Sequence, residues 1–64
     1  MSIKDDVIVF LKRKQTQLME RYAIWEDIQS EYLELYSLCQ KEMDRIDWIA
    51  ELIRKKMFEL KESE

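Results

Sequence analysis

The sequence predicts an all-α protein, and three observations support this fold class. Apolar residues recur alternately every three and four positions along almost the whole chain of 64 residues, which is the spacing of one helix face. Charged residues dominate the opposite face. The chain contains no Gly, Pro or Asn, the residues that tight turns most often use. We therefore expect one helical interaction domain, residues 1–64, with few turns or none.

The apolar seam starts at Ile8 and keeps one phase as far as Leu60. With Ile8 at heptad position a and Leu11 at d, fourteen of the sixteen a and d positions are apolar or aromatic. A 47% apolar chain would give seven or eight by chance. These seam residues are Ile8, Leu11, Leu18, Tyr22, Trp25, Tyr32, Tyr36, Cys39, Met43, Ile46, Ala50, Ile53, Met57 and Leu60. Because a turn has no reason to preserve the phase, the seam favours one long helix over residues 3–62 that self-associates as a coiled coil or bundle.

The apolar surface is wider than a strict a/d stripe. Apolar residues also fill half of the g positions and half of the c positions. These are Val7, Ile28, Leu35 and Ile49 at g, and Phe10, Ile24, Leu38 and Leu52 at c. Large aromatic residues also occupy the middle of the seam. Both features suit a bundle in which each helix contacts more than one neighbour.

An alternative architecture is a two-helix hairpin that dimerises into a four-helix bundle. Its turn would fit best at residues 14–17 or 28–31. Each segment contains a polar seam residue, and each offers a hydroxyl, Thr16 or Ser30, that can cap a new helix. The sequence leaves the long helix and the hairpin open as alternatives.

The sizes of the seam residues predict antiparallel packing. If two helices of different chains pack antiparallel about Glu34, Leu18 faces Ala50 and Trp25 faces Met43. Large residues then meet smaller ones, which lets the layers interdigitate.

The f positions lie opposite the seam, and seven of the eight are charged. Trp48 is the exception. An exposed Trp is typical of a binding contact, whereas a wider bundle would include Trp48 in its core. The candidate contacts for a partner protein are Trp48, Arg54, Lys55, Lys56 and Phe58.

No set of residues indicates catalysis, and we expect no enzyme, no cofactor and no metal. The chain has no His for acid–base chemistry and no Gly for a phosphate-binding loop. One cysteine alone forms neither an intrachain disulfide nor a zinc site. Because Cys39 lies on the seam, we interpret it as a small buried hydrophobic residue.

The charge pattern indicates a cytoplasmic protein. The net charge is −3, and the longest apolar run, residues 7–11, is too short to span a membrane. Acidic residues precede that run and basic residues follow it, which reverses the order of a signal peptide. Two basic triplets, residues 12–14 and 54–56, suggest contacts with nucleic acid, but acidic residues border both, so nucleic acid is disfavoured as a partner.

These features predict a non-enzymatic protein–protein interaction module whose partners are itself and a larger protein. The expected role is a small homo-oligomeric regulator, inhibitor or adaptor. The first alternative is a structural or assembly component, a scaffold or chaperone-like coiled coil whose seam itself carries the function. A nucleic-acid-binding helical dimer that uses both basic triplets is the second.

Overall fold

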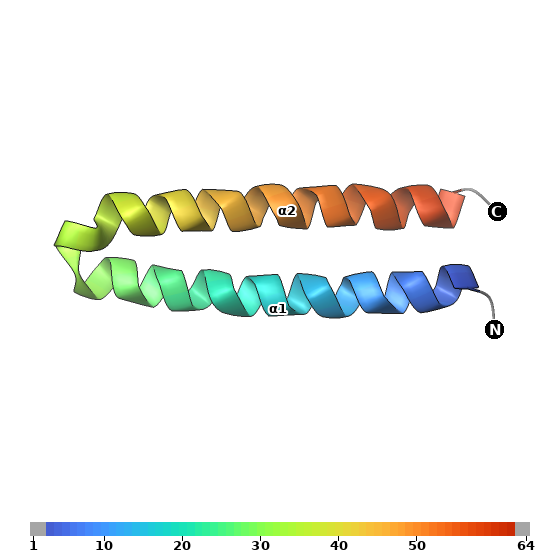
Figure 1. The fold of residues 1–64 in the computed structure, drawn as a ribbon, viewed down its shortest axis with the longest axis horizontal. Helices are drawn as coiled ribbons and strands as arrows, with labels where there is room; N and C mark the ends of the chain where they lie inside the picture. Colours follow the sequence, from blue (N-terminus) through green and yellow to red (C-terminus); the bar gives the residue numbers. More distant parts are fainter. Residues whose placement is uncertain (1–2, 63–64) are drawn as a thin grey trace.

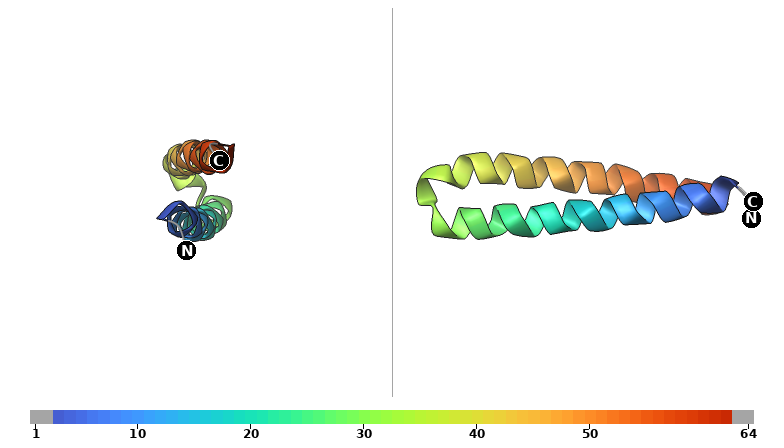
Figure 2. Two further views of the ribbon diagram at one scale, coloured as in Figure 1. Left: turned by 90° about the vertical axis from the view of Figure 1, so that its right-hand side faces the viewer. Right: turned by 60° about the horizontal axis from the view of Figure 1, so that its bottom comes forward.

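The computed structural model describes residues 3–62, and this part of the chain is an α-helical hairpin (Figure 1). Helix α1 spans Ile3–Glu31, a short 3₁₀ helix η1 spans Leu33–Leu35, and α2 spans Tyr36–Glu62. The helices lie antiparallel and side by side in every view (Figures 1 and 2). Residues 3–62 contain no strand, so the prediction of an all-α fold is confirmed.

The single long helix over residues 3–62 is wrong, and the two-helix hairpin of the alternative forms, while its dimerisation stays a prediction. The helical path breaks at Tyr32, whose φ of −125° and ψ of 93° are extended. The break is brief, because the Tyr32 N–H still donates to the Ile28 carbonyl at 2.9 Å and the Leu35 N–H donates to the Tyr32 carbonyl at 3.0 Å. No described residue has a positive φ, which explains how the chain turns without Gly or Asn.

Both predicted turn sites are wrong, since residues 14–17 and 28–31 lie inside α1. Their hydroxyls do not cap a new helix. Thr16 Oγ1 donates to the Lys12 carbonyl at 3.2 Å, and Ser30 Oγ donates to the Asp27 carbonyl at 2.9 Å. Serine and threonine commonly bond back to the preceding helical turn in this way, so both hydroxyls are satisfied within α1.

The core of the hairpin is small and comes from the seam. Within the described residues, its buried hydrophobic members are Cys39, Met43, Ile46 and Ala50, all on α2. The seam residues of α1 from Ile8 to Trp25 are half-buried against α2. Tyr32 and Tyr36, at the apex of the hairpin, are about half exposed and lie outside the core. The seam therefore packs on itself within one chain.

Gln29, one of the two polar seam residues, joins the helices near the apex. Its Nε2 donates to Gln40 Oε1 at 3.1 Å and to the Tyr36 carbonyl at 3.3 Å. Gln40 Nε2 in turn donates to Asp44 Oδ1 at 3.0 Å. A hydrogen bond of this kind contributes about 1 kcal/mol net, so the amide stabilises the apex by a modest amount.

Neither helix of the described chain contains a stretch that is long and apolar enough to cross a membrane.

Candidate interaction surfaces

The hairpin exposes far more large hydrophobic side chains than it buries. In residues 3–62, fourteen are exposed and four hydrophobic residues are buried. Small domains bury a limited fraction of their surface, and monomers seldom expose large contiguous apolar patches. The arrangement of these fourteen side chains therefore decides where this chain can bind another molecule.

Half of them gather on one side of the hairpin. In antiparallel helices that face each other through a and d, the g and c positions of both helices fall on the same side. The apolar residues of this side, which we call the broad face, are Val7, Phe10, Ile24, Ile28, Leu35, Leu38, Ile49 and Leu52. Ile28 and Ile49 are half-buried and the other six are 37–59% exposed. Ile3, 84% exposed at the start of α1, extends the same side.

A shallow pocket confirms that the g positions of the two helices share this side. It has a volume of about 230 Å³. Its lining comes from Lys14, Gln17, Leu18 and Arg21 of α1 and from Ile49 and Ile53 of α2. The lining thus combines three apolar side chains with two cations. Lys14 lies back over the Phe10 ring, with its Nζ 5.2 Å from the ring centroid, so its charge is held toward the N-terminal end of α1.

The opposite side of the hairpin carries fewer apolar residues. Four large hydrophobic side chains are exposed there, at b and e positions: Val9, Met19, Leu33 and Phe58. They are separated by charged residues, so this side offers no patch that compares with the broad face.

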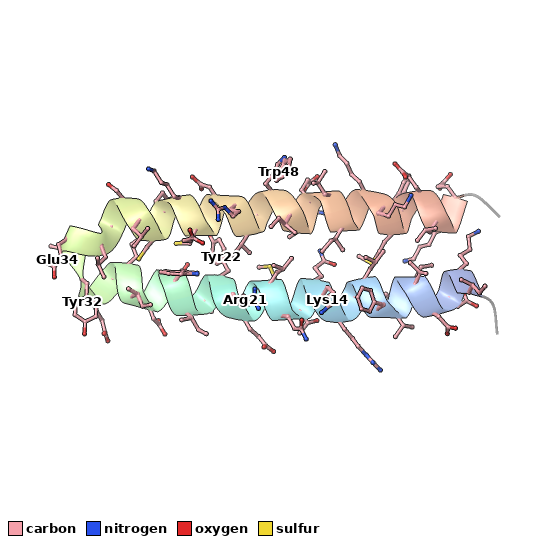
Figure 3. All side chains as sticks on the ribbon, in the orientation of Figure 1. Lys14, Arg21, Tyr22, Tyr32, Glu34 and Trp48 are labelled. Carbon is pink, nitrogen blue, oxygen red and sulfur yellow. The ribbon has the colours of Figure 1, made fainter. Side chains whose placement is uncertain are left out.

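Trp48 lies on the outer side of α2. It is 66% exposed and points away from α1, whereas Tyr22 lies between the helices (Figure 3). The interpretation that places Trp48 in the core does not hold within a single hairpin. The Trp48 side chain is therefore exposed to solvent and available for contact with another molecule.

The other candidate contacts divide into two groups. Lys55 is two helical turns beyond Trp48 on the same outer side, and Phe58 is 65% exposed nearby. At ~1.5 Å per residue, Phe58 lies about 15 Å along the axis from Trp48. Arg54 and Lys56 project to opposite flanks of α2. The structure thus brings Trp48, Lys55 and Phe58 together on one side, but not all five residues.

Arg54 and Lys56 are also engaged in ion pairs within their own helix. Arg54 pairs with Glu51, and Lys56 Nζ lies 3.7 Å from Glu59 Oε2. Exposed pairs at this spacing contribute little to stability, but they reduce the positive charge that a partner would meet. Within the described residues Lys55 makes no such pair, so it is the member of its triplet whose charge is open to a partner.

The fold separates charge along the hairpin, a feature that sequence reasoning missed. Residues 20–51, the apex half, contain nine acidic and three basic residues, which gives −6. The open half, residues 3–19 and 52–62, contains eight basic and four acidic residues, which gives +4. The hairpin also places the two basic triplets at the same level. The signal was present in the sequence, because both triplets lie equally far from residue 34.

The chain matches no protein family, no curated protein and no solved structure. Within the described residues, no three His, Cys, Asp or Glu side chains are placed to hold a metal ion together. The single cysteine, Cys39, is fully buried in the seam. The exposed apolar and charged surfaces are therefore the features from which a function can be inferred.

Proposed function

We propose that this chain is a non-enzymatic protein-interaction module, a small homo-oligomeric regulator, inhibitor or adaptor that binds a larger protein. The observation that carries the proposal is that, within residues 3–62, fourteen large hydrophobic side chains are exposed while the buried core has four residues. A hairpin with so small a core gains stability when further apolar surface is covered.

The outer side of α2 is the surface we assign to the larger protein. Trp and other aromatic residues dominate the energetics of protein interfaces, and Trp48 and Phe58 stand two-thirds exposed on this side. Lys55 lies between them and favours a partner that carries acidic groups. The mode of binding would be helix against helix or helix in groove, with anchors spaced along one side of α2.

The test is capture of a partner from cells of the native host by the full chain, compared with a Trp48→Ala variant. Truncation of a hot-spot residue typically costs at least about 2 kcal/mol, so we expect capture to weaken by about 30-fold or more. Tyr36→Ala is the control, because Tyr36 is a similarly exposed aromatic residue at the apex. Circular dichroism should show unchanged helix content in both variants. Equal capture by wild type and Trp48→Ala would contradict the proposal.

Nucleic-acid binding is a second candidate, because the hairpin aligns the two basic triplets. Two of the six cations, Arg54 and Lys56, are partly neutralised by Glu51 and Glu59, which argues for a weaker surface than the sequence suggests. Binding of a duplex with a steep dependence on salt concentration would support this candidate over the first. The assembly scaffold receives less support, because the seam that such a scaffold would use packs within one chain.

A further inference from the structure

We propose that a second copy of this chain docks on the broad face, with the two apices at opposite ends, to form an antiparallel four-helix bundle. The inference deepens the proposed function, on which it rests for the expectation that the chain self-associates. It assigns self-association to the g and c positions and leaves the seam inside each hairpin. Trp48, on the outer side of α2, stays outside this contact and accessible to a foreign partner.

The area of the broad face matches what a stable dimer requires. The six exposed apolar residues of the face present about 500–600 Å² of side-chain surface, if each would present roughly 200 Å² when fully exposed. The Cα positions extend over 48 × 16 Å, so the whole face covers on the order of 800 Å². One partner contributes about that area to an interface of standard size. A second copy can therefore cover the entire apolar patch.

The overall charge distribution favours one relative orientation of the two copies, although most of the charged residues lie off the broad face. With the apices at the same end, the −6 half of one hairpin would lie on the −6 half of the other, and the +4 half on the +4 half. With the apices at opposite ends, each negative half lies on a positive half. Complementary charge of this kind selects orientation and suppresses the competing arrangement.

The apolar side chains match in the same orientation. A two-fold axis near the middle of α1, which spans Ile3–Glu31, brings Phe10 level with Ile24 of the second copy. The same axis brings Val7 level with Ile28 of the second copy. On α2 it superposes the regions around Ile49 and Leu52 on each other. Apolar groups of the broad face therefore meet apolar groups along α1 and in the middle of α2, whereas Leu35 and Leu38 at the apex lie level with no described residue of the second copy.

Like charges oppose this arrangement on α2, where Glu42 comes level with Glu59 and Arg45 with Lys56 of the second copy, and at its centre on α1. Lys14 comes level with Arg21 of the second copy, and both residues line the pocket. Their long aliphatic stems can carry the charges to the edge of the contact, as Lys14 already does over Phe10. Replacement of this repulsion by an apolar group should favour association. We therefore expect Arg21→Leu to tighten the dimer.

The first test compares two phenylalanines on opposite sides of the hairpin. Phe10 on the broad face is 55% exposed, and Phe58 is 65% exposed outside it. Sedimentation equilibrium should show a dimer for the wild type, at least a 30-fold weaker dimer for Phe10→Glu, and wild-type affinity for Phe58→Glu. A wild type that stays monomeric up to about 100 μM overturns the proposal, as does a Phe10→Glu dimer of unchanged affinity.

The second test measures orientation without a change to the broad face, so it holds even if Phe10→Glu fails to fold. A spin label at the apex, through Glu34→Cys in a Cys39→Ala background, reports the distance between the two copies. Apices at opposite ends should give a distance near the 48 Å length of the hairpin. A distance below about 20 Å places the apices together and refutes the orientation.

The two proposals can fail separately. A Phe10→Glu monomer that still captures a partner through Trp48 would support the proposed function and show that dimerisation is not needed for binding. A dimer with the expected orientation whose Trp48→Ala variant captures its partner normally would refute the partner surface and leave the dimer intact.

Discussion

Leu33→Pro is the sharpest test of where the chain turns. Leu33 opens η1, follows a residue in extended conformation and is 80% exposed. Proline favours the first helical position, and the residue before it favours the extended geometry that Tyr32 adopts. The structure records no acceptor for the Leu33 N–H within the described residues, so its loss breaks no hydrogen bond.

The magnitude of this effect follows from the same geometry. Reduced freedom of the unfolded chain stabilises by about 0.4–1 kcal/mol when proline fits the native backbone. Loss of the one-fifth of the Leu33 side chain that is covered costs about 0.3–0.5 kcal/mol. The free energy of unfolding should therefore change by between about 0 and +0.7 kcal/mol. In a continuous helix the same substitution would cost about 3 kcal/mol or more.

Urea unfolding, followed by circular dichroism at fixed protein concentration, measures this difference. Leu52→Pro is the matched control, because Leu52 lies in the middle of α2 and should lose about 3 kcal/mol or more. The reasoning is refuted if Leu33→Pro destabilises the protein as much as Leu52→Pro does.

Two further predictions test the core and the topology. Met43→Ala should lower the free energy of unfolding by about 2–4 kcal/mol in a urea titration, because Met43 is 95% buried. Met19 is half-exposed, so Met19→Ala should lower the free energy of unfolding by about 1 kcal/mol or less. Equal losses of stability in the two variants would show that the buried residues of α2 are not the core. Spin labels at Lys4→Cys and Lys61→Cys of one Cys39→Ala chain, diluted with unlabelled protein, should lie roughly 10–20 Å apart, because α1 and α2 pack side by side and both positions lie at the open end of the hairpin. A separation of about 85 Å would indicate the continuous helix instead.

Periodicity alone predicted the fold class and most of the side chains that face inward. From Ile8 to Trp25, and from Cys39 to Leu60, the a and d residues are half-buried or buried as the seam requires. The seam contained no information on whether its partner stripe belongs to the same chain, because a hairpin and an antiparallel dimer of long helices place the same residues opposite each other. The size match about Glu34 applies equally to both.

Entropy explains why the hairpin forms in preference to the long helix. Association of two chains costs an estimated 4–15 kcal/mol of translational and rotational freedom, whereas closure of a short turn costs much less. The turn itself breaks helical geometry at one residue, Tyr32, and neighbouring helical turns hold both sides of the break. Sequence reasoning sought Gly, Asn or a capping hydroxyl at the turn, and this turn uses none of them.

The use of the seam within one chain changes which residues remain for interactions with other molecules. A seam exposed on a long helix would have served self-association, and little besides Trp48 would have been left for a foreign partner. In the hairpin, the g and c residues form a separate apolar face. The f and b residues of α2 form another surface, on which Trp48 is 66% exposed. The two surfaces adjoin on α2, where Trp48 and Leu52 are one helical turn apart, but the residues tested on each are distant, since Phe10 lies on α1 and Trp48 points away from α1. A chain of this size can therefore present one face to its own copy and another to a larger protein, and single substitutions at Phe10 and Trp48 should separate the two activities.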